Sequence, residues 1–85
     1  MQSENHMTRD KVIDTMSRLY NEDNEDYYVY FKGHKRPIPI GSSAGFQART
    51  EEHALDIIDE DTGTLIGTFD YSEIQAITSY PIFID

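Results

Sequence analysis

Residues 54–69 read ALDIIDEDTGTLIGTF and decide the fold class of this 85-residue chain. Two runs rich in apolar and β-branched residues, 54–59 and 64–69, flank the polar tetrapeptide of residues 60–63. Because Gly63 can adopt the positive φ that a tight turn requires, the segment predicts a β-hairpin. An antiparallel sheet is therefore part of the fold.

Other segments extend this predicted sheet on both sides of the hairpin. Residues 27–31 (YYVYF) are dominated by aromatic and β-branched residues, and their alternation predicts a strand with both faces at least partly covered. Residues 36–40 (RPIPI) contain two prolines, which cannot donate to a ladder, so we expect an edge strand or an extended segment beside one. A short strand is predicted at residues 46–50 and a last strand at residues 74–80.

An amphipathic helix of about three turns is predicted to begin after Thr8, because apolar residues recur there at helical spacing. Thr8 is a suitable N-cap, and Asp10 favours the positive end of the helix dipole. The run NEDNED at residues 21–26 should end the helix in a solvated turn. Before the last strand, Asp70 is expected to cap a single helical turn.

These elements predict an α+β fold: an N-terminal helix followed by a small, strongly curved antiparallel sheet or an SH3/Sm-like barrel of four to five strands. Residues 57–77 (IIDEDTGTLIGTFDYSEIQAI) resemble the C-terminal half of the YolD-like family in their apolar spacing. The resemblance implies a barrel-like fold and implies no particular chemistry. Residues 1–7 are interpreted as a flexible leader or a remnant of cloning, and residues 8–85 as a single domain.

The composition narrows the classes of function. Sixteen acidic residues against seven basic ones give a net charge of -9, which repels phosphate backbones and anionic lipids and attracts basic partners. The chain has no cysteine, so disulfides, thiolate catalysis and cysteine-ligated zinc are excluded. No apolar run approaches the roughly 20 residues of a membrane span, and no signal peptide is recognisable, so we expect a cytoplasmic protein.

Catalytic and metal-binding motifs do not emerge from the sequence. Residues 59–64 are acidic and contain a glycine, but their spacing does not match a calcium loop. His6 lies in the expected leader, while His34 and His53 fall in predicted turns without a paired nucleophile. We therefore expect no cofactor, no metal and no catalytic residue, unless an enzyme or ligand site lies in a cleft between the helix and the sheet.

The leading hypothesis is a protein-interaction domain of bacterial or phage type that presents acidic loops to a basic surface of a partner. In its sharpest form the domain mimics a nucleic acid, with carboxylates placed where phosphates would lie. This hypothesis requires the carboxylates to gather on one side of the domain. The predicted partner-binding residues are Asp23, Glu25, Asp26, Asp59, Glu60 and Asp61, with Tyr28 and Tyr30 as aromatic anchors.

Two alternatives remain open for other segments. Lys32, Lys35 and Arg36 lie beside aromatic residues and could bind single-stranded nucleic acid, or they could simply balance acidic neighbours. The apolar C-terminal residues 80–84 (YPIFI) could fold back over the sheet, or they could pair with a second copy to form a homodimer.

Overall fold

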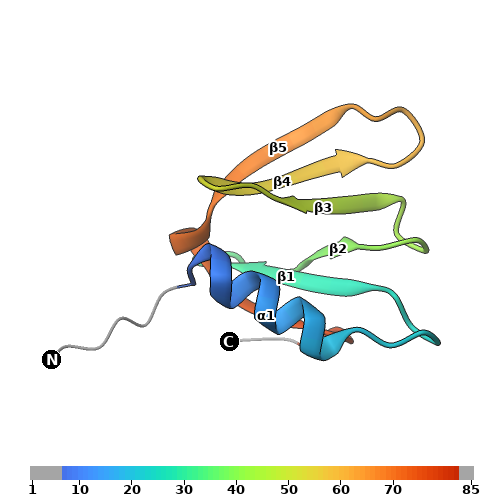
Figure 1. Cartoon of the computed structure of the whole chain (residues 1–85), viewed down its shortest axis with the longest axis horizontal. Coiled ribbons are helices and arrows are strands. Elements are labelled where there is room, and N and C mark those ends of the chain that lie inside the picture. The colour runs from blue at the N-terminus through green and yellow to red at the C-terminus, as the bar shows by residue number, and fades with distance from the viewer. Residues whose placement is uncertain (1–6, 83–85) are drawn as a thin grey trace, which may run out of the picture.

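The computed structural model describes residues 7–82, which form one α-helix, one 3-10 helix and six strands (Figure 1). In chain order these elements are α1 (Arg9–Leu19), β1 (Tyr27–Phe31), β2 (Ile38–Ile40), β3 (Phe46–Thr50), β4 (Ala54–Asp59), β5 (Leu65–Asp70), η1 (Tyr71–Glu73) and β6 (Ile74–Thr78). Within these residues, no helix has the length and apolar character needed to cross a membrane. Residues 1–6 of the expected leader, with His6, and residues 83–85 lie outside the described part of the chain.

The predicted α+β class is confirmed, and the strands form two antiparallel sheets of three. Their orders are β2-β1-β6 and β3-β4-β5. An isolated bridge between Gly41 and Phe46 links the sheets where β2 passes into β3, and the described residues do not close into a barrel. Residues 7–82 form one strand more than the upper number expected, because residues 38–40 and 46–50 each form a short strand of their own.

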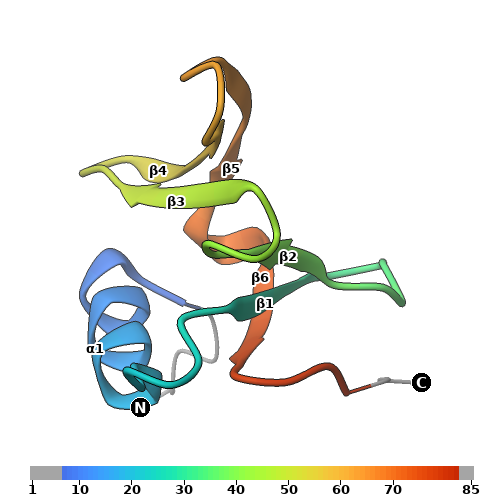
Figure 2. The ribbon, with the colours of Figure 1, turned by 90° about the vertical axis from the view of Figure 1, so that its right-hand side faces the viewer.

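A single apolar core lies between the helix and the two sheets, and Figure 2 shows α1 beside β1 with the β3-β4-β5 sheet beyond them. Helix α1 contacts both β6 and β3, so it bridges the sheets on this side. Of its residues only Val12 is fully buried, while Met16 and Leu19 are partly buried against the core. The buried members of the core are Val12, Val29, Phe31, Ile40, Leu55, Ile57, Tyr71, Ile74 and Ile77.

The residues predicted to cap the helices and to form the hairpin turn take these roles in the structure. The Thr8 hydroxyl accepts a hydrogen bond of 3.3 Å from the Lys11 backbone N–H, which confirms Thr8 as the N-cap of α1. Asp70 caps η1 by accepting a bond of 2.8 Å from the Ser72 N–H. Gly63 has a φ of +74°, and the hairpin of β4 and β5 forms as predicted.

The side chain of Tyr71 ties η1 to the residue that follows β3. It is 7% exposed, and its hydroxyl donates to the backbone oxygen of Glu51. Burial raises the pKa of Tyr71 above its ordinary value of 10.0, against the opposing influence of Arg9. The folded state therefore favours the neutral phenol.

This raised pKa predicts a loss of stability at alkaline pH. Because the folded-state pKa lies above the unfolded value of 10.0, the stabilisation is complete below that pH and is lost as pH rises through the folded pKa. Urea unfolding across this range should therefore show a steeper fall in the free energy of unfolding for the wild type than for Tyr71→Phe. Parallel pH profiles of the two proteins would contradict the prediction.

Candidate functional site

Three connecting segments meet at one end of the molecule, and strand register brings them there (Figure 1). Because Tyr27 pairs with Ile40 across β1 and β2, the turn before β1 lies next to the loop after β2. Because Phe46 pairs with Asp59 across β3 and β4, the same loop also borders the β4–β5 turn. We call residues 21–26, 41–45 and 59–64 together the acidic end.

Hydrogen bonds hold the first turn of the acidic end against the central loop. The Ser42 hydroxyl donates to Glu25 Oε1 at 3.0 Å, and the Ser43 N–H donates to Asp26 Oδ1 at 3.2 Å. Gly41 lies so close to this turn that a Cβ added to it would be 2.7 Å from the Cα of Asp26. The Asn24 side chain anchors the turn by donating to the Ser79 backbone oxygen at 3.0 Å. Glu25 and Asp26 are therefore oriented by the fold.

The β4–β5 turn joins the opposite side of the same loop. The Glu60 N–H donates to the Gly45 oxygen at 2.9 Å, and Gln47 Nε2 donates to Glu60 Oε2 at 3.1 Å. Asp59 Oδ1 accepts from the N–H groups of Asp61 and Thr62 at 2.9 and 3.2 Å. The Asp59 carboxylate thus organises its own turn, as short polar side chains commonly do.

The acidic end concentrates negative charge without a compensating cation. Residues 21–26 contribute four carboxylates and residues 59–64 contribute three, which makes seven, and the three segments contain no lysine, arginine or histidine. All six carboxylates predicted to bind a partner are among them. Three of the seven are exposed and make no hydrogen bond or ion pair within residues 7–82: Glu22, Asp23 and Asp61.

A shallow hollow of about 300 Å³ opens in this surface. It lies between the 21–26 turn and the 41–45 loop, and its walls carry four carboxylates and two serines. The lining residues are Glu22, Asp23, Asn24, Glu25, Asp26, Ser42 and Ser43. Such a surface can receive a cationic side chain, because carboxylate oxygens form charge-assisted hydrogen bonds with ammonium and guanidinium groups.

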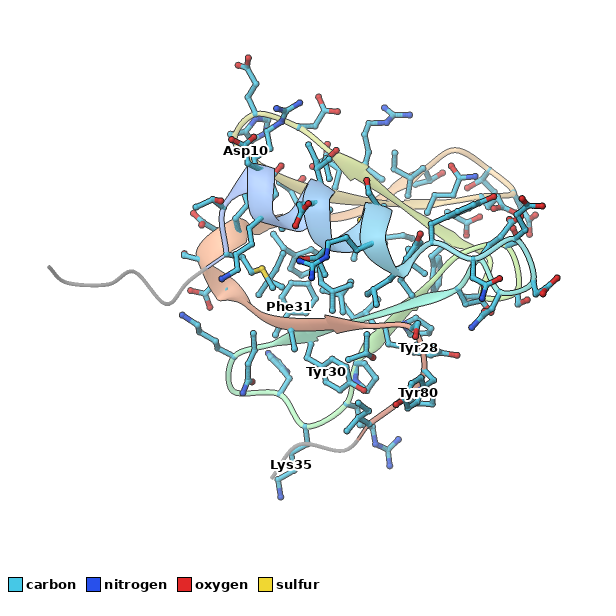
Figure 3. All side chains as sticks on the ribbon, turned by 60° about the horizontal axis from the view of Figure 1, so that its bottom comes forward. Asp10, Tyr28, Tyr30, Phe31, Lys35 and Tyr80 are labelled. Carbon is cyan, nitrogen blue, oxygen red and sulfur yellow. The ribbon has the colours of Figure 1, made fainter. Side chains whose placement is uncertain are left out.

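The prediction that Tyr30 is an aromatic anchor for a partner is wrong. Tyr30 is 0% exposed, and its hydroxyl accepts a hydrogen bond from the Ile82 N–H. Residues 80–82 lie over the face of β1 that points away from the core, near the labelled Tyr30 in Figure 3. Tyr28 is half-buried on the same strand, beside the 21–26 turn.

The contact between Ile82 and Tyr30 also shows where the described part of the C-terminal segment lies. Ile82 lies against Tyr30, so the part of the predicted apolar tail that the structure describes folds back over the sheet. Tyr80 remains 64% exposed. Phe83 and Ile84 lie outside the described residues, and pairing with a second copy stays a prediction.

The basic residues Lys32, Lys35 and Arg36 lie in the β1–β2 turn, at the other end of that hairpin from the acidic end. Figure 2 shows this turn on the side away from α1, and Figure 3 labels Lys35 at its tip. All three are exposed. Tyr30 is fully buried, so its ring is not available to stack on the bases of a nucleic acid.

Catalytic geometry is not apparent in the described part of the chain. Among residues 7–82, no carboxylate or histidine side chain is buried, and no three metal-ligating side chains converge. Comparison of the chain with protein-family models, curated proteins and solved structures finds no match. Function is therefore inferred from the surface geometry.

Proposed function

We propose that this chain is a small protein-interaction domain whose acidic end binds a lysine- and arginine-rich surface of a partner protein. The observation that carries the proposal is the meeting of two acidic turns around residues 41–45 without any cation among them. Turns that are 33 residues apart, from Asp26 to Asp59, act together only because of the strand register. Seven carboxylates in one region create a negative potential that attracts cations and accelerates encounter with a basic surface.

The hollow provides a specific feature within this charged surface. In the free domain, Glu25 and Asp26 already accept hydrogen bonds from the Ser42 hydroxyl and the Ser43 N–H. Binding a partner would therefore lose less conformational entropy at these two residues. Asp23 is exposed at the same hollow and keeps its carboxylate available. One lysine or arginine side chain of the partner would enter the hollow, and neighbouring cations would contact the β4–β5 turn.

Nucleic-acid mimicry is the most specific version of this proposed function. Carboxylates spread over two turns would occupy the positions of phosphates and block a nucleic-acid-binding protein. Arginine and lysine residues that recognise phosphates also recognise carboxylates, so such a partner already has complementary chemistry. We expect this activity in the cytoplasm of a bacterial or phage-infected cell.

A charge-matched pair of variants tests the proposal. The first variant neutralises the three unbonded carboxylates of the acidic end as Glu22→Gln/Asp23→Asn/Asp61→Asn, and the control neutralises three other surface carboxylates as Asp10→Asn/Asp14→Asn/Glu52→Gln. Both change the net charge from -9 to -6, because each removes three negative charges. In calorimetric titrations with a lysine- and arginine-rich peptide, the first variant should bind about tenfold more weakly than the control, since a few charge pairs of under about 1 kcal/mol each are lost.

Amide chemical shifts give a second, site-specific result. On adding the same peptide to the wild type, the largest changes should fall in residues 22–26, 42–43 and 59–61. Equal weakening in both variants would mean that only net charge attracts the peptide, and the proposal would fail. Tight binding of single-stranded DNA by the wild type, weakening as salt rises, would instead favour the nucleic-acid-binding alternative at the β1–β2 turn.

A further inference from the structure

A second hollow, of about 200 Å³, lies between the β1–β2 turn and the junction of β5 with η1. Its apolar wall consists of Phe31, Ile38 and Phe69. The rings of Phe31 and Phe69 have centroids 4.5 Å apart and are tilted by 33°. One ring comes from each sheet, so the hollow lies at the boundary of the two sheets.

The hollow is largely preformed. Phe31 is only 6% exposed and belongs to the core, so its ring is fixed. The Lys32 N–H donates to the Glu73 oxygen at 2.8 Å and ties the turn to η1, and the His34 N–H donates to the Phe31 oxygen at 3.1 Å. Preformed hollows that combine apolar walls with a few polar groups are typical of small-ligand sites.

Two cations and a histidine surround this apolar wall in an otherwise acidic protein. Lys32, His34 and Arg36 line the hollow, together with the single acid Glu73. Although the chain has sixteen acidic residues, neither Lys32 nor Arg36 forms an ion pair within the described residues 7–82. Both side chains are therefore available to an incoming anion.

We infer that this hollow binds a small organic anion with one aromatic or branched apolar body and one carboxylate or phosphate group. The apolar body would pack on Phe31 and Phe69, and the anionic group would bind Lys32 and Arg36. The volume is below the roughly 300 Å³ at which sites for drug-sized ligands begin, which limits the body to about one ring. A net charge of -9 disfavours polyanions far more than a ligand with a single charge.

Titration of the ¹⁵N-labelled full chain with benzoate tests this inference, because benzoate has one ring and one carboxylate. Saturable shifts are expected at the amides of residues 32–36 and 69. Benzyl alcohol, which keeps the ring and lacks the charge, should bind about tenfold more weakly, as expected when charge-assisted hydrogen bonds are lost. Lys32→Ala and Arg36→Ala should each weaken benzoate binding by about fivefold, because each removes one partly exposed charge pair.

Lys35→Ala is the matched control. Lys35 lies in the same turn and carries the same charge, yet it does not line the hollow. Its removal should leave benzoate binding within about twofold of the wild type, since rim charges outside a site act only through screened long-range attraction. Equal binding of benzyl alcohol, equal weakening by Lys35→Ala, or the absence of saturable shifts would each overturn the inference.

Discussion

Replacing Gly41 with alanine is expected to destabilise the folded protein by about 3 kcal/mol, the sum of backbone strain and of a steric clash in a packed region. Gly41 has a φ of +131°, which L side chains rarely adopt. The added Cβ would also lie 2.7 Å from both the Asp26 Cα and the Glu25 oxygen. These are backbone atoms, so they cannot move aside as a flexible side chain would. Urea unfolding measures the loss.

Gly33→Ala and Gly45→Ala separate the two contributions. Both glycines have positive φ, +82° and +79°, but an added Cβ would meet nothing within 4 Å at either position. Each substitution should lower the free energy of unfolding by only about 1 to 2 kcal/mol, the penalty for a non-glycine residue in this conformation. If these two substitutions lower the free energy of unfolding as much as Gly41→Ala does, the close approach of residues 41–45 to the 21–26 turn is unimportant for stability.

The same substitution also tests how the acidic end is built. If the clash separates the 21–26 turn from residues 41–45, the bonds from Ser42 and Ser43 to Glu25 and Asp26 are lost. The variant that remains folded should then bind a basic peptide more weakly than Gly45→Ala does. A loss of both stability and binding in Gly41→Ala would show that they share this one contact between backbones.

The sequence predicts the local elements well, because their signals are local. Helix α1 follows from its apolar spacing and from Thr8, and the β4–β5 hairpin follows from alternation and from Gly63. Asp70 predicts η1 in the same way. Each of these signals acts within a few residues, so no knowledge of the tertiary fold is needed.

The long-range features of the fold do not follow from local sequence signals. The sequence does not indicate that Gly41 packs against the 21–26 turn, where a Cβ added to it would lie 2.7 Å from the Asp26 Cα. The alternation of β1 indicates that Tyr30 points away from the core, but it does not reveal that residues 80–82 cover it. Likewise, sequence spacing does not bring Phe69 next to Phe31, because their contact joins strands of different sheets.

Replacing Leu55 with alanine is expected to lower the free energy of unfolding by about 2 to 5 kcal/mol, as the truncation of other buried leucines does. Leu55 is 0% exposed in β4, the central strand of its sheet, with Thr50 on one side and Phe69 on the other. A domain of this size is commonly stable by only about 5 to 10 kcal/mol, so a large share of its stability would be lost. Thermal unfolding should show a midpoint lower by about 10 °C or more.

Leu65→Ala removes the same atoms from the neighbouring strand and serves as the control. Leu65 is 54% exposed in β5, which is an outer strand, and the neighbouring Ile66 is equally exposed. Truncating Leu65 should therefore lower the free energy of unfolding by under about 0.5 kcal/mol. A cost comparable to that at Leu55 would contradict the burial assigned to β5. It would mean that a second molecule covers this edge in solution, and the unfolding midpoint would then rise with protein concentration, since assembly stabilises the folded chain by mass action.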